Sequence, residues 1–351
     1  MVNVGLIGCG GIAKLHMQVY DSMKNVNVVG LCDLDLERAN FLAKKHNVSE
    51  TFKSYVELVE SKNLDMVDIC TPVSTHAKIA CDVAKNVPAI LVEKPMALSV
   101  SECDEMIKET KKYGSKLCIS HNQIFLPSIQ KAKNFVDNGD FELLSFATTQ
   151  KESFESLKSH ELAADWMIMP NQKGIIWEVC CHLAYLQLHF LPNISEVYAI
   201  GTKSKHPVYD HFAVLLRTPS DTFGVIELSW VSDETEIIYE IRGTKGKRAQ
   251  IYRDFDYFFE NTVEPPLKSS NVFRGFFADE KRILKKWSNF GLNYFQKRKM
   301  IPHLQLVGKY MESIKNDLPP PITPQDGKNT INLLECIEKS LNEKRPVSVI
   351  N

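Results

Sequence analysis

Short apolar runs alternate with amphipathic segments through roughly the first 120 residues of the chain. Continuous apolar runs are typical of strands buried on both faces of a sheet. The pattern predicts strands over residues 4–7, 26–32, 66–70, 88–92 and 116–120. It predicts helices from near residue 11 and over residues 35–46, 54–61, 74–85 and 99–113. Because helices join successive strands by right-handed crossovers, this part predicts an α/β fold with a parallel, doubly wound sheet.

From about His121 the strands follow one another without helices between them. A helix over residues 127–138, a strand over 143–150 and a long apolar helix over 174–191 are expected first. Strand-like segments then cover residues 195–201, 208–217, 222–231, 236–243 and 247–252. Consecutive strands predict an antiparallel or mixed sheet, so we expect an α+β domain at residues 122–351 after an α/β domain at residues 1–121.

The last part of the chain is expected to be mainly helical. An irregular loop over residues 261–270 precedes a basic helix over 279–298 and a further helix over 303–315. Thr323 as N-cap and Pro324 as the first helical residue then begin a final helix. The cations of the basic helix are expected to form a solvated face or the rim of an interface. The alternative is that a few of them bind an anionic substrate such as a sugar phosphate.

Composition narrows the class of protein. The length of 351 residues favours two domains, and a hydrophobic content of 44% is that of ordinary packed cores. A formal net charge of −1 gives no electrostatic basis for binding nucleic acid or a membrane surface. No apolar stretch would span a bilayer, and the chain opens on a strand, not on a secretory signal. Nine cysteines without a Cys-x-x-Cys pair predict free thiols, and therefore a cytoplasmic protein.

A glycine-rich turn of the form Gly-x-Gly-x-x-Ala runs from Gly8 to Ala13 after the first predicted strand. Gly8 permits the tight turn, Gly10 lets the backbone approach a pyrophosphate, and Ala13 lets the next helix pack closely on the sheet. The helix that begins near Gly11 directs its free N–H groups and positive dipole end at the phosphates. Asp33 ends the second predicted strand, where its carboxylate accepts ribose hydroxyls and repels a 2′-phosphate. The motif predicts a dinucleotide site that favours NAD, with NADP possible.

The tripeptide Glu93-Lys94-Pro95 directly follows a predicted strand, at the sheet edge where ligands bind. A lysine at this place can donate to a substrate oxygen or polarise a carbonyl group. A solvated turn lysine is equally consistent with the tripeptide. Pro95 is a candidate for a cis peptide bond.

Glu178 and His182 lie four residues apart, which places them on one face of a helix. The acid can hold the imidazole in one tautomer and leave the other nitrogen as a general base for a hydroxyl proton. From spacing alone, a histidine packed in the core of an apolar helix is the favoured alternative. The run Cys180-Cys181-His182 cannot readily surround one tetrahedral ion, and no metal site is predicted.

Together these motifs resemble the glucose–fructose oxidoreductase, inositol dehydrogenase and rhizopine-catabolism (Gfo/Idh/MocA) oxidoreductase family. The resemblance covers essentially the whole chain, through the glycine-rich turn, Cys32-Asp33, residues 70–76, Glu93-Lys94-Pro95, and residues 174–182, 243–246 and 320–327. It implies a Rossmann domain, a second domain with an open, mainly antiparallel sheet, and an active site between them. It also implies a homodimer or homotetramer formed through the open sheet.

The resemblance assigns roles to single residues. Lys94 and His182 match the catalytic lysine and histidine of the family, and Glu178 stands where the family usually has aspartate. The implied cofactor-binding residues are Gly8, Gly10, Gly11, Ile12, Asp33, Thr71, Pro72, His76, Glu93 and Lys94. Asn122 and Trp177 are expected to face the substrate, with the indole stacked on a sugar ring or, as the alternative, buried in the core.

The activity that the resemblance implies is hydride transfer between NAD and a secondary hydroxyl of a sugar, cyclitol or sugar derivative. Cys180 replaces a usual glycine and Tyr185 replaces an aspartate often found after the histidine, which leaves the substrate open. One rival is an enzyme that keeps NAD bound and uses transient oxidation for elimination or glycoside cleavage. The other is a non-catalytic sugar- or NAD-sensing regulator, which the presence of both Lys94 and His182 disfavours.

Overall fold

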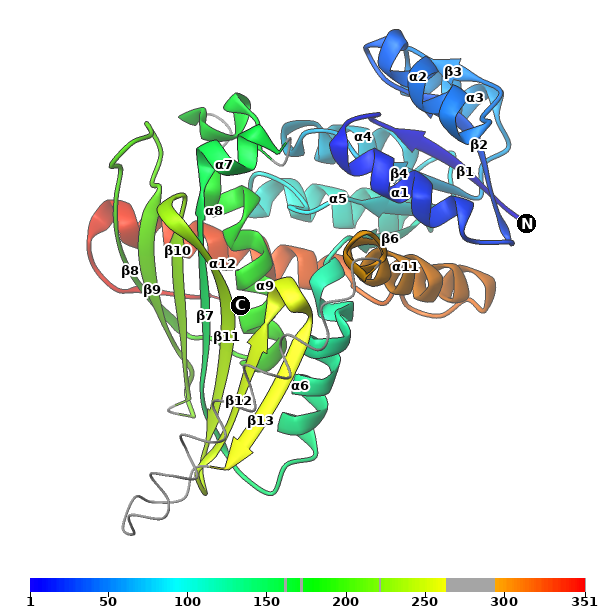
Figure 1. Ribbon diagram of the computed structural model, residues 1–351. Helices are drawn as coiled ribbons and strands as arrows, with labels where there is room; N and C mark the ends of the chain where they lie inside the picture. Colours follow the sequence, from blue (N-terminus) through cyan, green and yellow to red (C-terminus); the bar gives the residue numbers. More distant parts are fainter. Residues whose placement is uncertain (161–162, 171–172, 221, 263–293, 351) are drawn as a thin grey trace.

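The computed structural model describes residues 1–160, 163–170, 173–220, 222–262 and 294–350. It contains a six-stranded sheet in the N-terminal part of the chain and an eight-stranded sheet in the C-terminal part (Figure 1). The predicted class, an α/β sheet followed by a mainly antiparallel sheet, is confirmed. None of the described helices combines the length and apolar character that a membrane span requires.

The first sheet contains the strands β1 (Val2–Ile7), β2 (Val26–Cys32), β3 (Thr51–Phe52), β4 (Met66–Ile69), β5 (Ala89–Val92) and β6 (Lys116–Ile119). The connecting helices are α1 (Gly11–Asp21), α2 (Leu36–His46), α3 (Tyr55–Ser61), α4 (His76–Val83) and α5 (Val100–Tyr113), with the short η1 (Val73–Thr75) before α4. All pairs are parallel, in the order β3-β2-β1-β4-β5-β6. The order reverses between β1 and β4, and in such sheets ligands bind beyond the carboxyl ends of the strands at this point.

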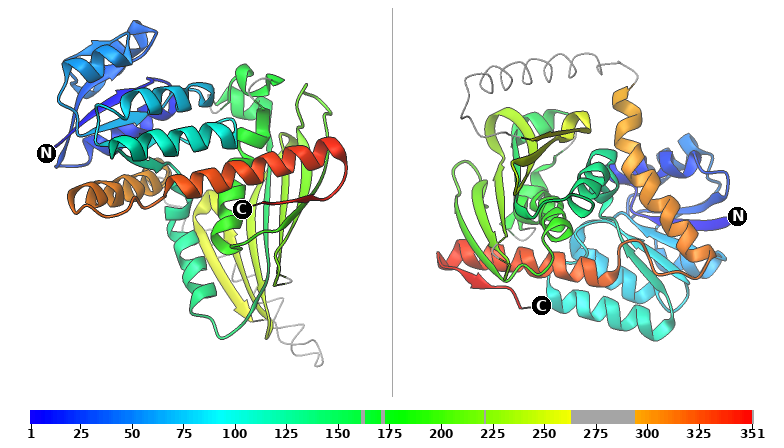
Figure 2. Two further views of the ribbon diagram at one scale, coloured as in Figure 1. Left: turned by 180° about the vertical axis from the view of Figure 1, so that it is seen from behind. Right: turned by 90° about the horizontal axis from the view of Figure 1, so that it is seen from below.

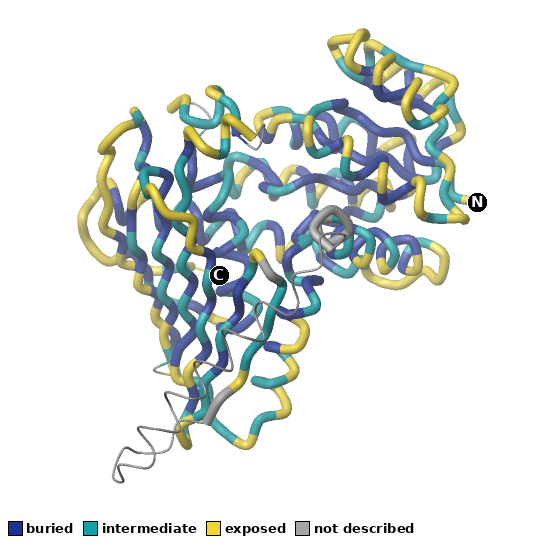
Figure 3. The backbone as a smooth tube through the Cα atoms, in the orientation of Figure 1, coloured by how far each residue is buried: buried dark blue, intermediate teal, exposed yellow. Residues whose placement is uncertain are grey.

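The second sheet contains β7 (Leu143–Ser153), β8 (Glu196–Thr202), β9 (His211–Arg217), β10 (Phe223–Ser229), β11 (Val231–Gly243), β12 (Lys247–Tyr252), β13 (Tyr257–Thr262) and β14 (Val347–Ser348). Its order is β13-β12-β11-β7-β10-β9-β8-β14, and β7 with β10 is a parallel pair in an otherwise antiparallel sheet. Side chains of β9 alternate between buried and exposed, because one face of the sheet is covered and the other is not (Figure 3).

The second part also contains η2 (Asn122–Phe125), α6 (Pro127–Asp137), α7 (Phe154–Ser159), η3 (Asp165–Ile168), α8 (Gly174–Glu178), α9 (Cys180–Phe190) and η5 (Arg253–Phe255). Helices α6 and α9 pack against the covered face of the second sheet. The opposite face exposes large apolar side chains at Tyr198, Ile200, Leu215 and Phe223.

Two C-terminal helices return to the first sheet. They are α11 (Tyr294–Lys315), which packs against α1, and α12 (Pro324–Glu343), which packs against α5 and β6 (Figure 2). The hydroxyl of Tyr310 on α11 donates to the carbonyl oxygen of Lys116 at 2.6 Å and accepts the N–H of Ile90 at 3.1 Å. Because α11 and α12 pack against elements of the first sheet although they lie beyond residue 121, a domain boundary at residue 121 remains a prediction.

The structure differs from the predicted elements in several places, and the strands β3, β13 and β14 and the helix α7 are not among those predicted. The apolar stretch over 174–191 is two helices, α8 and α9, separated at Val179, and not one. Helix α11 begins at Tyr294, before the predicted start at His303, and includes Pro302. The predicted loop over 261–270 and the predicted basic helix over 279–298 lie mostly outside the described residues.

Candidate active site

The glycine-rich turn between β1 and α1 has the geometry that a dinucleotide requires. Gly8 has φ +92°, and a Cβ there would lie 2.7 Å from a backbone carbonyl oxygen after β4, so glycine is needed. A Cβ on Gly10 or Gly11 would meet nothing within 4 Å among the described residues beyond the turn and its helix, which leaves the start of α1 open. Asp33 accepts the backbone N–H of Cys9 at 2.7 Å and therefore lies beside the turn. This arrangement fits a pyrophosphate and an adjoining ribose.

Lys94 lies in the loop after β5, and its bond to Pro95 is cis. Its Nζ donates to the backbone carbonyl oxygen of Glu178 at 3.0 Å and lies 3.6 Å from a carboxylate oxygen of the same residue. Burial would lower the pKa of Lys94, but the carboxylate of Glu178 opposes this, and the net pKa lies above the ordinary value. Lys94 is therefore a cation that can polarise a substrate oxygen.

His182 lies in the first turn of α9, with its Nδ1 2.7 Å from the hydroxyl of Tyr185. Burial lowers the pKa of His182 well below its ordinary value, and the charges of Lys94 and Arg253 lower it further. The imidazole is therefore neutral near pH 7, which a general base requires.

The described residues show other partners for Glu178 and His182 than the predicted pairing of the two side chains with each other. The carbonyl oxygen of Glu178 accepts from Lys94, and the N–H of His182 bonds to the carbonyl oxygen of Val179, three residues back. The helix is interrupted at Val179, between α8 and α9, and among the described residues no hydrogen bond joins the two side chains. The carboxylate pairs with Lys94 instead, and a catalytic role for Glu178 stays a prediction.

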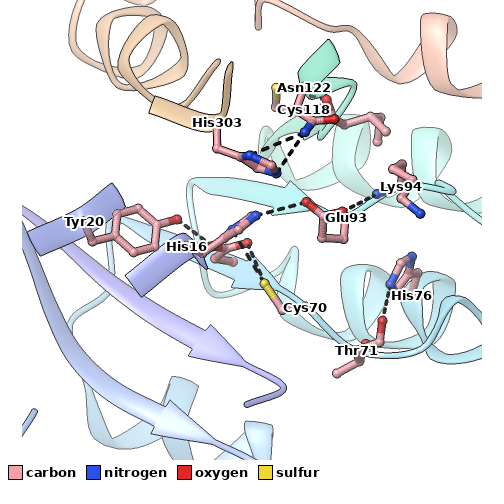
Figure 4. Close-up of polar contacts among 12 residues, drawn as sticks. His16, Tyr20, Cys70, Thr71, His76, Glu93, Lys94, Cys118, Asn122 and His303 are labelled. Carbon is pink, nitrogen blue, oxygen red and sulfur yellow. Dashed lines mark hydrogen bonds and ion pairs between the residues drawn. The ribbon is translucent and has the colours of Figure 1, made fainter. Parts of the chain in front are cut away.

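A buried cluster of charged side chains lies beneath the Lys94 loop (Figure 4). The imidazole of His16 on α1 lies between two carboxylates, with Nδ1 2.7 Å from Asp68 and Nε2 3.0 Å from Glu93. Tyr20 donates its hydroxyl to Asp68 at 2.6 Å. Burial is the largest single effect on the pKa of His16 and lowers it, but the charges and hydrogen bonds of Asp68 and Cys70 together raise the net pKa well above its ordinary value. His16 is therefore an imidazolium that neutralises buried carboxylates.

This cluster supports the loop through Glu93, which was predicted to contact the cofactor. One oxygen of Glu93 accepts from His16, and the other accepts the backbone N–H of Lys94 at 3.2 Å. The carboxylate is thus directed into the protein (Figure 4), and its predicted contact with the cofactor stays a prediction. Ligand atoms of His16, Glu93 and His303 lie within 4.8 Å of one another, but a protonated His16 between two carboxylates has no lone pair for a metal.

The loop after β4 contains three further predicted cofactor residues. Thr71 is half-buried and Pro72 is exposed, while the ring of His76 is buried. The two ring nitrogens of His76 lie 2.8 Å from the carbonyl oxygens of Thr71 and Pro95, and burial lowers the pKa of the ring. His76 therefore ties this loop to the Lys94 loop (Figure 4). Ile12 is half-buried in the first turn of α1, and contact of these four residues with a cofactor stays a prediction.

The two predicted substrate residues have different surroundings. Asn122 is half-buried, and its amide lies 3.1 Å from Nε2 of His303 and 3.3 Å from the hydroxyl of Tyr185. Trp177 has no exposed surface, and its indole N–H donates to the carbonyl oxygen of Ala97 at 3.3 Å. The prediction that Trp177 stacks on a sugar ring is therefore not supported, because the indole is fully buried and the Nζ of Lys173 lies 4.4 Å over its ring.

Four residues of the site had no role in the sequence interpretation: Tyr185, His16, His303 and Arg253. Tyr185 follows His182 by three residues, a spacing that brings side chains together on a helix, so it could have been found. His16 lies one turn after Ala13 on the helix that begins at the glycine-rich turn. Nothing local in the sequence marks His303 or Arg253, because both reach the site through long-range packing.

Solved structures and relatives resemble the chain over most of its length. The myo-inositol 2-dehydrogenase of Thermotoga maritima is 25% identical over 364 aligned residues, covering 99% of this chain and 98% of that protein. The 2,7-anhydro-N-acetylneuraminate hydratase of Escherichia coli K12 is 27% identical over 253 residues, covering 70% of this chain and 66% of that protein. A levoglucosan dehydrogenase in complex with NADH and levoglucosan superimposes with a TM-score of 0.78 at 18% identity, over 100% of both chains.

Family profiles match both parts of the chain. Residues 2–121 match an oxidoreductase family with an NAD-binding Rossmann fold. Residues 129–248 match the GFO/IDH/MocA C-terminal domain. The two matches are separated by residues 122–128, which include Asn122, and together they cover the first sheet and the strands β7 to β11 of the second. The chain belongs to the GFO/IDH/MocA oxidoreductase family.

Proposed function

We propose that the protein transfers hydride between NAD and a secondary hydroxyl of a sugar, cyclitol or sugar derivative. Membership of the family makes the chain an NAD-dependent dehydrogenase of CH–OH groups. The observation that carries the proposal is the placement of two polar side chains from different elements, with the ammonium of Lys94 3.0 Å from the carbonyl oxygen of Glu178 and Nδ1 of His182 2.7 Å from the hydroxyl of Tyr185. The names of the inositol and levoglucosan dehydrogenases support the substrate class.

In the proposed reaction, Lys94 donates a hydrogen bond to the substrate oxygen and stabilises the negative charge that develops there. His182 removes the hydroxyl proton. NAD held at the glycine-rich turn would supply the hydride acceptor. Glu178 holds the ammonium of Lys94, and the cluster around His16 fixes the backbone that carries it. Neutral His182 and cationic Lys94 thus divide the work between proton removal and charge stabilisation.

A substrate panel tests this proposal. Free sugars, inositols, sugar phosphates and nucleotide sugars are incubated with NAD and with NADP, and the absorbance of the reduced cofactor is followed. We expect stoichiometric NADH with at least one polyol. Product formation without net NADH would favour a redox-elimination enzyme, a possibility that the relative named as a hydratase supports. Tight NAD binding with no product from any compound would favour a sensing regulator.

Asp33→Ser is expected to weaken NAD binding by about 10- to 100-fold, since charge-assisted hydrogen bonds are worth roughly 1.5–3 kcal/mol. NADP binding should improve, because the repulsion of a 2′-phosphate is removed. Calorimetric titration of both dinucleotides measures the two effects. Asp35→Ser is the matched control, because it removes an equal charge two residues away and serine still caps α2, where Asp35 accepts N–H bonds. Equal affinity of the wild type for NAD and NADP would contradict this role of Asp33.

We also propose that the protein forms a homodimer or homotetramer through the uncovered face of the second sheet. Ile200 and Leu215 on that face are 58% and 54% exposed. Leu215→Glu is expected to dissociate the oligomer to the 39.9 kDa monomer in light scattering. Phe41→Glu is the matched control, because Phe41 is 67% exposed on α2, outside this face. A wild-type protein that is monomeric at micromolar concentration would rule out the interface.

A further inference from the structure

The hydroxyl of Tyr185 lies at the centre of a buried hydrogen-bonding group beside His182. It is 2.7 Å from Nδ1 of His182 and 3.3 Å from Oδ1 of Asn122, and it accepts the backbone N–H of Gln123 at 3.1 Å. The tyrosine is 2% exposed, and its ring stacks on His121 with centroids 4.3 Å apart and planes at 16°. The phenol is therefore held in place by its ring as well as by its hydroxyl.

Counting donors and acceptors gives the direction of these bonds. A phenol has one proton to donate and two lone pairs. The amide nitrogen of Asn122 faces the ring of His303, so its carbonyl oxygen faces Tyr185 and requires a donor. The phenol proton satisfies that oxygen, and one lone pair accepts the N–H of Gln123. The remaining lone pair is left to accept a proton from Nδ1 of His182.

We propose that Tyr185 is a positioning residue that holds His182 as the Nδ1–H tautomer and leaves Nε2 as its basic nitrogen. The catalytic consequence rests on the proposed function, because only a proton-accepting Nε2 can take a hydroxyl proton from a substrate. If the phenol instead donated to Nδ1, the proton would lie on Nε2 and the histidine could not act as a base through that atom. Tyr185 thereby orients the imidazole of His182, the role that the sequence analysis predicted for Glu178.

A phenol also differs from a carboxylate in its effect on the charge of the imidazole. A neutral hydroxyl orients the ring without stabilising the imidazolium, whereas a carboxylate would raise the pKa of the ring. Beside the phenol of Tyr185, the charged and titratable groups that act on the pKa of His182 include Lys94, Arg253, Glu93 and His121. The charges of Lys94 and Arg253, together with burial of the ring, lower its pKa and keep the histidine neutral. An aspartate at position 185 would oppose them.

The tautomer is measured directly by long-range ¹⁵N–¹H NMR of histidine-labelled protein. His182→Gln identifies the His182 signals by difference. In the wild type we expect a protonated Nδ1 and an unprotonated Nε2 at neutral pH, and a variant is needed only to assign the His182 signals. A protonated Nε2 in the wild type would overturn the proposal.

Variants then separate orientation from packing. In Tyr185→Phe the imidazole of His182 should become a mixture of its two neutral tautomers, including the Nε2–H form. We expect kcat to fall about tenfold or more, with little change in KM. Tyr239→Phe is the matched control, because it removes another buried hydroxyl, which donates to Gln123 at 3.2 Å, and should leave the His182 spectrum unchanged. An unaltered tautomer in Tyr185→Phe would overturn the proposal.

Tyr185→Asp supplies a pH test. A carboxylate beside Nδ1 should raise the pKa of the base, so the acid limb of kcat/KM against pH should move to higher pH than in the wild type. If the acid limb of the pH profile of kcat/KM did not move, the result would contradict contact between residue 185 and His182. If the NMR result is as expected but no polyol is oxidised, the tautomer assignment stands and the proposed function fails.

Discussion

Lys94→Ala and His182→Ala are each expected to lower turnover by about 10²- to 10⁴-fold, the usual contribution of a positioned acid–base group. Removing Lys94 takes away the cation that stabilises charge on the substrate oxygen, and removing His182 takes away the proton acceptor. NAD affinity should change little, because the glycine-rich turn and Asp33 hold the pyrophosphate and ribose. Steady-state kinetics and NAD titration on the same preparations measure both quantities.

The double variant should lose less than the product of the two single losses, because both residues act on one proton path. Lys78→Ala is the control for removing a lysine, since Lys78 is exposed on α4 and pairs with Asp82. The alternative, a histidine that matters for packing alone, predicts a His182→Ala protein that melts early and turns over normally. That result would remove His182 from the mechanism.

His16→Ala is expected to destabilise the protein by about 3–5 kcal/mol, because it leaves Asp68 and Glu93 buried without their shared cation. Urea unfolding at pH 6 measures the loss in the free energy of unfolding. His46→Ala is the control, because His46 pairs with Asp21 at 2.6 Å but that carboxylate is 51% exposed and remains hydrated. The control should therefore lose less stability. Equal losses in both variants would show that the cluster contributes nothing beyond packing.

The same cluster predicts a pH dependence. His16 has a raised pKa in the folded protein, so its stabilisation is complete below the unfolded value of about 6.5 and is lost as the pH rises through the folded value. Glu93 has a lowered pKa, so its stabilisation is present above about pH 4.5 and is lost as the pH falls. The stability difference between wild type and His16→Ala should be flat between these limits and decrease above pH 6.5. A difference that grows with alkaline pH would contradict a protonated His16.

Much of the fold could be predicted from local patterns. The strands of the first sheet are short apolar runs, and both β4 and β5 are buried along their whole length as such runs require. The turn at Gly8 could be predicted because its positive φ restricts it to glycine. The break at Val179 could not, because the segment is apolar on all sides and its burial hides any helical period.

The site was predicted less completely, because its contacts join residues far apart in the chain. The spacing in the sequence predicted that Glu178 pairs with His182. In the structure Glu178 forms an ion pair with Lys94 from another loop, and His182 is hydrogen-bonded to Tyr185. The cluster of His16 with Glu93 spans 77 positions, which no local pattern reports. Trp177 was predicted to contact the substrate because its ring is flat and apolar. The structure buries it completely, and this burial depends on tertiary packing that the local sequence does not report.

The return of α11 to the first sheet constrains the order in which a newly made chain can fold. During synthesis, residues 1–121 leave the ribosome long before His303 and Tyr310 do. Until those residues arrive, the backbone N–H of Ile90 lacks its tyrosine partner, and the ring of His303 is missing from beside His16. The nucleotide-binding half therefore reaches its final form only after residues 303–310 have been synthesised, and it completes its folding together with the second half of the protein.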